Sequence, residues 1–81
     1  MYIDKFGDIT DIRAEKDGEI WVEGINIDGQ NFAIPVTLFS VEYIAEKLVK
    51  IMECDKYKDR HEEAKELLDK CITIKSTRCE L

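Results

Sequence analysis

The sequence predicts an α+β fold, in which a three-stranded antiparallel meander is followed by two helices and a short C-terminal strand or tail. Two apolar-rich runs in the first half of the chain each follow an Asp-Gly pair, Asp17-Gly18 or Asp28-Gly29. Asp-Gly between such runs is a strong hairpin signal, because a type I′ turn needs positive φ at both central residues. Apolar residues at helical spacing in the second half predict the helices.

The first expected strand covers Asp8–Lys16. Its Ile9 falls out of phase with the positions that share one face, which are Thr10, Ile12 and Ala14. The lead-in ahead of it, residues 1–7, is expected to cover an end of the core.

The second expected strand, Glu19–Ile27, changes phase in its middle. Ile20 and Val22 share a face, but the later isoleucines have the opposite parity. Gly24 separates the two sets, so we expect a β-bulge there to restore the phase. Trp21 projects on the face opposite Val22.

The third expected strand, Gln30–Thr37, contains Pro35. Proline cannot donate to a ladder of hydrogen bonds, so this strand is expected at an edge of the sheet. The last strand of a three-stranded meander is also an edge, and the two inferences agree.

Two amphipathic helices are expected after the sheet. Ser40 is the expected N-cap of the first helix, and residues 54–58 interrupt the pattern. Asp59-x-x-Glu62 has the form of a capping box for the second helix, and the β-branched Ile72–Ile74 is read as a short terminal strand or tail. The apolar stripes are Val41, Ile44, Ala45, Leu48, Ile51 and Met52 in the first helix, and Ala64, Leu67, Leu68 and Cys71 in the second.

The length of 81 residues predicts a single acidic domain, residues 1–81. No apolar run approaches the roughly 20 residues of a membrane span, and the N-terminus lacks the basic start of a signal peptide. We therefore expect a cytoplasmic protein without membrane contact.

The net charge of −6 is unevenly distributed. Residues 1–40 contain eight acids and three bases, a net charge of −5, whereas residues 41–81 contain ten acids and nine bases, a net charge of −1. A field of one sign repels nucleic acid and attracts basic partners, although it also serves solubility alone.

The three cysteines, Cys54, Cys71 and Cys79, are odd in number and are expected as reduced thiols. A zinc site would add His61, but the spacings lack the short pairs of structural zinc sites. We expect neither a metal nor a cofactor.

Catalysis is not expected either. His61 is the one histidine, and it is expected as a solvated residue at the exposed start of a helix. The candidate nucleophile for it is Cys71, which is ten residues on and is expected to face the core. The glycines are scattered singly, so no loop is built to hold a phosphate.

The candidate binding feature is the tip of the second hairpin, Asp28-Gly29-Gln30-Asn31. A carboxylate, bare backbone and two amides would meet there, and carboxylates pair with the planar fork of arginine. Turn geometry alone also explains Asp28 and Gly29.

Four segments, from about residue 20 to 76, match a known family in order and approximate spacing. They resemble small acidic anti-CRISPR proteins of phages, the compact inhibitors of the type II RNA-guided nuclease. The segments are Asn26–Gly29 followed by Phe32, Ile44–Leu48, Tyr57–Asp59 followed by Glu62-Glu63, and Ile72–Ser76.

The resemblance implies a non-enzymatic inhibitor that mimics the charge of DNA and occupies the arginines that read the short motif flanking the target. Its contacts carry over to Asp28, Gly29 and Asp59, and its location would be the cytoplasm of the phage's host. The chain departs from the family at Arg60, where an acid is expected, and at its start, which is read as a strand where the family has a helix.

We therefore expect an acidic inhibitor of a basic, nucleic-acid-binding effector, a CRISPR nuclease or a related defence protein, acting as a monomer or homodimer without binding nucleic acid directly. The alternative is a self-associating structural or regulatory module that pairs through an open sheet edge. The expected contact residues are Asp28, Gly29, Asn31 and Asp59, supported by Asp17, Glu23, Glu62 and Glu63.

Overall fold

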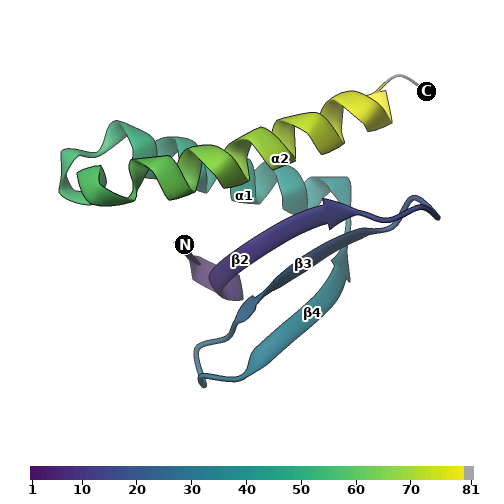
Figure 1. Ribbon diagram of the computed structural model, residues 1–81, viewed down its shortest axis with the longest axis horizontal. Helices are drawn as coiled ribbons and strands as arrows, with labels where there is room; N and C mark the ends of the chain where they lie inside the picture. Colours follow the sequence, from purple (N-terminus) through teal and green to yellow (C-terminus); the bar gives the residue numbers. More distant parts are fainter. Residues whose placement is uncertain (80–81) are drawn as a thin grey trace.

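The computed structural model describes the backbone of residues 1–79 and the side chains of residues 1–77. The elements in chain order are β1 (Tyr2–Ile3), η1 (Asp4–Phe6), β2 (Gly7–Ala14), β3 (Ile20–Ile25), β4 (Asn31–Val36), α1 (Leu38–Glu53), η2 (Asp55–Arg60) and α2 (His61–Cys79). The fold is α+β: α1 and α2 lie along one side of an antiparallel sheet, with β2 nearest to them and β4 farthest away (Figure 1).

The predicted meander is present as β2, β3 and β4, and a fourth strand extends it. The sheet order is β1-β2-β3-β4, with every neighbouring pair antiparallel. β1 comes from the lead-in: Tyr2 pairs with Asp8 and Ile3 with Gly7. A strand of two residues has no periodicity for a sequence pattern to detect, so the prediction of three strands is one short.

β2 carries a β-bulge. Its pairing with β3 shifts between Ile9 and Asp11, which leaves Thr10 as an extra residue in the strand. The bulge restores the phase, so Ile9 and Ile12 are buried on the same face. The predicted face is therefore wrong at Thr10, which is exposed in the bulge. Ile12 and Ala14 do share a face, since they pair with the buried Val22 and Ile20, although Ala14 is exposed at the end of the strand.

Gly24 lies in β3 opposite this bulge and does not form one itself, which corrects the predicted position. A Cβ atom at Gly24 would lie 2.3 Å from the backbone oxygen of Asp8, so glycine is what permits the two strands to approach here. Since side chains in β3 keep their regular alternation, Ile25 lies on the face of the sheet away from the helices. Ile27, in the following turn, is 78% exposed.

Both Asp-Gly pairs form hairpin turns, but not of type I′. In the described chain only glycines have positive φ, whereas a type I′ turn requires it of the aspartate as well. The amides of Gly18 and Gly29 donate to the carbonyls of Glu15 and Asn26, at 3.0 and 2.9 Å. Each glycine, with φ of 90° or 82°, therefore ends a three-residue loop in the left-handed position that follows a type I turn.

α1 begins before its predicted N-cap. Thr37 is the cap, and its side-chain oxygen accepts a hydrogen bond from the amide of Ser40 at 3.3 Å. The predicted stripe is confirmed, since Val41, Ile44 and Leu48 are buried.

α2 continues to Cys79, so the short C-terminal strand or tail predicted at Ile72–Ile74 is wrong. β-branched residues only slightly disfavour a helix, and tertiary packing overrides that preference where Ile74 enters the core. The interruption predicted between the two helices, at residues 54–58, corresponds to η2. The predicted stripe is confirmed, with Ala64, Leu67 and Cys71 buried and Leu68 packed against them.

The core lies between the two layers and is apolar. No polar or charged side chain is buried among the described residues. Each fully buried large side chain stabilises the fold by about 1.5–3 kcal/mol. The largest of these side chains are Ile3, Ile9, Ile12, Ile44, Leu48, Val22, Val41 and Cys71.

β4 is an edge strand, as Pro35 predicts. It is the strand farthest from the helices (Figure 1), and Ile34, which shares a face with the core, is 39% exposed. The β3–β4 ladder starts from the hydrogen bond between Asn26 and Gln30, and hydrogen-bonded pairs then alternate. This alternation directs the nitrogen of Pro35 toward the free edge.

Candidate interaction surfaces

The predicted contact residues of the sheet layer lie at both ends of β3. Asp17 is in the turn between β2 and β3, whereas Asp28 and Gly29 are in the turn between β3 and β4, next to Asn31 at the start of β4. Glu23 lies between the two turns, on the face of β3 away from the helices. These residues therefore follow the length of the sheet and do not form a single cluster.

The β3–β4 turn is held by the side chain of Asn26. Its Oδ1 accepts hydrogen bonds from the amides of Asp28 and Gln30, at 3.0 and 2.9 Å. Such a side-chain turn fixes the backbone, so the exposed carboxylate of Asp28 is presented on an ordered loop.

The predicted contact residues of the helix layer are separated from these. Asp59 lies in η2, and Glu62 and Glu63 lie in the first turn of α2. Glu63 accepts a hydrogen bond at 2.7 Å from the amino group of Met1, which also lies 2.5 Å from Asp8. The charge of Glu63 is thus balanced within the molecule, and Asp59 and Glu62 are exposed on a different layer from Asp17 and Asp28.

An acidic cluster surrounds Trp21 on the face of the sheet away from the helices. Glu15, Asp17 and Glu19 line a shallow hollow of about 510 Å³ with this indole, and the indole Nε1 donates to Oε2 of Glu19 at 3.2 Å. Glu23 follows on the same face of β3. We call this surface the acidic face and define it by Glu15, Asp17, Glu19, Trp21 and Glu23.

Arg13 is held between two carboxylates of the acidic face. Its Nε lies 2.7 Å from Oε1 of Glu15, and its second nitrogen lies 2.6 Å from Oε1 of Glu23. The hydrogen bonds that the guanidinium donates to Glu15 and then to Glu23 raise the pKa of Arg13, which stays charged. With Lys16 as the other cation at this hollow, its three carboxylates exceed the two cations, and Glu23 adds a fourth carboxylate to the acidic face.

The prediction from sequence includes Asp17 and Glu23 but misses Glu15, Glu19 and Trp21. A signal for two of these is present, because Glu19, Trp21 and Glu23 alternate with apolar residues along one strand. The contribution of Glu15 depends on the turn geometry, which brings it beside Arg13.

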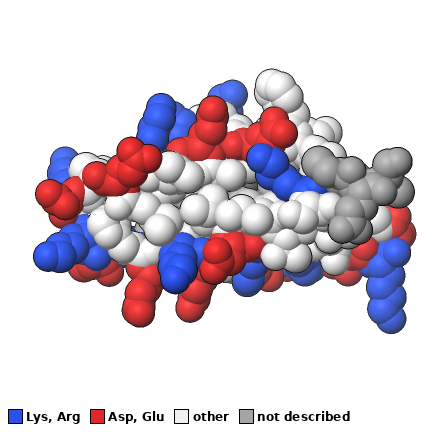
Figure 2. Space-filling view, turned by 90° about the horizontal axis from the view of Figure 1, so that it is seen from above, with Lys and Arg blue, Asp and Glu red and all other residues white. Residues whose placement is uncertain are grey.

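A second surface lies on the helix layer, in a groove between α1 and α2 with a volume of about 950 Å³. Viewed from the helix side, a band of uncharged side chains runs along the molecule between two charged flanks (Figure 2). Phe39, Ile72 and Val49 are 81%, 51% and 39% exposed here. We call this surface the helix groove and define its apolar residues as Phe39, Ala45, Val49, Leu68 and Ile72. The sequence prediction misses it, because it assigns Ile72 to a strand or tail.

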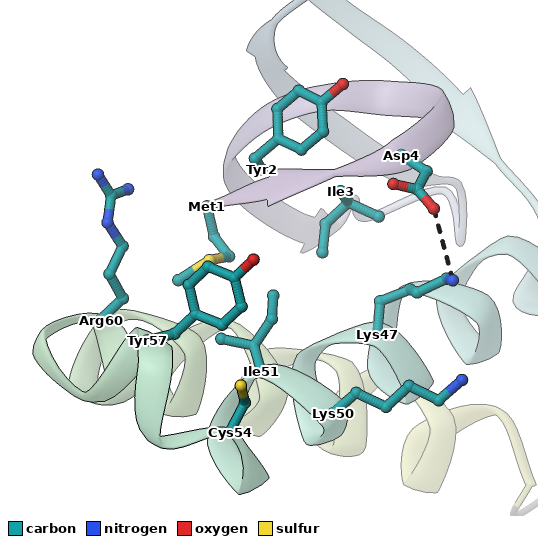
Figure 3. A pocket seen from close by; sticks show the side chains of 10 residues that line it. All are labelled: Met1, Tyr2, Ile3, Asp4, Lys47, Lys50, Ile51, Cys54, Tyr57 and Arg60. Atoms are coloured by element: carbon teal, nitrogen blue, oxygen red, sulfur yellow. Dashed lines mark ion pairs between the residues drawn. The ribbon is translucent and has the colours of Figure 1, made fainter.

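A third hollow, of about 540 Å³, lies between β1, α1 and η2 (Figure 3). Three cations line it, but Lys47 pairs with Asp4 at 3.5 Å, and the side chains of Lys50 and Arg60 point away from each other. Recognition of an anion needs donors that converge on one point. This hollow therefore does not form an anion site.

The groups capable of acid–base or metal chemistry lie apart. His61 is half-buried, with Nε2 3.0 Å from the carbonyl oxygen of Cys54, so its prediction as a solvated residue is wrong in part. Burial raises the pKa of the Cys71 thiol to about 11. Among residues whose side chains are described, no group of three His, Cys, Asp or Glu is placed to hold a metal ion.

Comparisons with protein-family models, curated proteins and solved structures found no match to this chain. Within the described residues, neither helix is both long enough and apolar enough to cross a membrane. The acidic face and the helix groove are therefore the two surfaces from which a function can be inferred.

Proposed function

We propose that this protein is a non-enzymatic inhibitor that uses its acidic face to occupy the nucleic-acid-binding surface of a basic protein. The observation that carries the proposal is the division of charge: residues 1–40, which contain the whole sheet and the start of α1, have a net charge of −5, and the rest of the chain has −1. Such asymmetry orients a basic partner toward the sheet and accelerates its association.

The chemistry of the acidic face suits an arginine-rich partner. Carboxylates accept two hydrogen bonds from a guanidinium fork, and an indole face attracts a cation. Glu19 and Trp21 already lie in contact, and Asp17 borders the same hollow. An arginine that binds a phosphate or a guanine would find equivalent acceptors here.

The resemblance to anti-CRISPR proteins supports the choice of partner, a CRISPR effector nuclease or a related defence protein. Asp28, Gly29 and Asn31 extend the proposed contact to the far end of the sheet. Asp59 belongs to the helix layer, and the proposal leaves it outside the contact.

The test compares two double variants that change the net charge equally. Asp17→Lys with Glu19→Lys reverses charge on the acidic face, and Glu66→Lys with Asp69→Lys does so on the exposed side of α2. We expect the first variant to weaken binding to a guide-loaded type II nuclease by about 2–3 kcal/mol, and the second by less than about 1 kcal/mol.

Binding kinetics at low and high salt complete the experiment. The association rate of the parent protein should fall as salt rises, because screening removes the steering field. Equal losses in the two variants would show an effect of net charge alone and would overturn the assignment of the acidic face. Unimpaired DNA cleavage at saturating protein would overturn inhibition of this nuclease class.

A further inference from the structure

The helix groove is an apolar surface without a covering element. Three of the exposed large apolar side chains of the described chain, Phe39, Val49 and Ile72, line it together. Scattered exposed apolar residues are ordinary on a protein surface, but apolar residues grouped in a groove with a charged rim mark an interaction site. Both charge signs occur on this rim (Figure 2).

The two helices that form the groove are aligned in a fixed register. Nζ of Lys75 lies 4.0 Å from Oε1 of Glu42, so these residues stand at nearly the same level of the antiparallel pair, within about one helical turn. With equal rise per residue, Val49 then stands level with Leu68. By the same alignment Ala45 stands level with Ile72, and Glu53 is level with Lys65 to within one residue.

These four levels pair apolar with apolar or acid with base, whereas Glu46 and Lys50 also line the groove from α1 alone. If a second copy stacks face to face on a two-fold axis parallel to the helices, α1 of one copy lies over α2 of the other without axial shift. The complementary pairs are then repeated between the copies. A two-fold axis across the helices would instead set α1 antiparallel over α1. The carboxylates of Glu42, Glu46 and Glu53 on one copy would then share one stripe with those of the other copy.

The available area is sufficient for a specific dimer. Helices of 16 and 19 residues give a face about 25 Å long, and two adjacent helices are about 20 Å wide. Each copy therefore offers roughly 500 Å² in projection, and the pair about 1,000 Å², which reaches the lower bound for a biological interface.

We propose that the helix groove binds a second copy of this chain, forming a two-fold dimer in which α1 of each copy packs over α2 of the other. The sheet layers, with their acidic faces, then lie on the outside of the assembly. The proposal does not depend on the inhibitory function, since it is tested on the protein alone.

The first experiment measures molar mass by sedimentation and light scattering over a concentration series. We expect a concentration-dependent dimer in the parent protein, and a monomer in Ile72→Asp. The matched control is Ile27→Asp, which places the same charge on an exposed isoleucine of the β3–β4 turn and should leave the dimer intact. A parent protein that stays monomeric throughout the series overturns the proposal and leaves a helix of another protein as the occupant of the groove.

The second experiment is a charge exchange that remains informative if Ile72→Asp fails to fold. Glu42→Lys with Glu53→Lys should raise the dimer dissociation constant about tenfold, and so should Lys65→Glu with Lys75→Glu. Combining all four substitutions should restore the parent dissociation constant, because each pair is again opposite in charge. Failure of the combination to restore dimerisation would overturn the proposed crosswise packing.

Discussion

The two outer surfaces of this molecule differ in kind. The acidic face gathers four carboxylates around Trp21, with Arg13 held between two of them. The helix groove exposes Phe39 and Ile72 between flanks of both charge signs. One surface is organised by charge and the other by apolar area, although both rest on the same core.

Net charge and exposed apolar area therefore indicate two separate interactions in one small chain. Contacts organised by charge act through the association rate and weaken with salt, whereas contacts organised by apolar burial persist in salt. Variants that change both surfaces, or only one of them, can distinguish these two kinds of contact.

The largest effect on stability is expected in the core, which supports both surfaces. Leu48 is fully buried on α1, so Leu48→Ala should lower the free energy of unfolding by about 2–5 kcal/mol. Urea denaturation measures this loss. Its neighbour Val49 is half-exposed in the groove, and Val49→Ala should cost less than about 1 kcal/mol while weakening dimerisation. Equal losses would mean that the groove is as closely packed as the core.

The next effect is confined to the sheet. An added Cβ at Gly24 meets the backbone of β2, so Gly24→Ala should lower the free energy of unfolding by about 3 kcal/mol. Gly29→Ala has open space but a positive φ, and should cost only about 1 kcal/mol. Thermal unfolding of the two variants compares them, and a milder Gly24→Ala would contradict the close approach of β2 and β3.

A smaller effect belongs to the helix layer and depends on pH. Burial raises the pKa of the Cys71 thiol from its ordinary value of 9.0 to about 11. The folded state therefore favours the protonated thiol, whose contribution to stability is complete below pH 9 and is lost as the pH rises through 11. We expect this thiol to account for a fall of about 2 kcal/mol in the free energy of unfolding over that window. Denaturant titrations of Cys71→Ala should lack this part of the fall, and an identical pH dependence would refute it.

The smallest effect is on affinity, and it compares one charge reversal in the sheet layer with one in the helix layer. Asp28→Lys, at the β3–β4 turn, should weaken binding to the basic partner by about 1 kcal/mol. Asp59→Lys makes the same charge change in η2 and should leave affinity nearly unchanged. Parallel titrations of the two variants check this, and a greater loss at Asp59 would move the contact to the helix layer.

The sequence was sufficient for the elements whose pattern is long. The three main strands, the edge position of β4 and both apolar helix stripes follow from periodicity and Pro35. The bulge at Thr10 could not be predicted, because a single extra residue resembles a change of phase in either strand. Ile72 and Ile74 were assigned to a strand or tail, because local propensity does not include the core that Ile74 fills.

The candidate surfaces were predictable to a lesser degree. The charge division between the halves is readable from composition, and it located the acidic layer. Chain order alone implies that Asp17 and Asp28 lie at opposite ends of β3, since they flank the expected second strand. What sequence could not show is that Glu15 and Glu23 both reach Arg13 on one face of the sheet. It also could not recognise the helix groove, which depends on how α1 and α2 align.

The free edge of β4 has one further consequence. Its outward amides include those of Asn31 and Ala33, but Pro35 contributes none, so an incoming strand meets a missing donor. Cross-β stacking needs an uninterrupted row of such donors, and proline is absent from the segments that form it readily. The protein could therefore reach a high concentration in a cell without its exposed edge strand starting fibril growth.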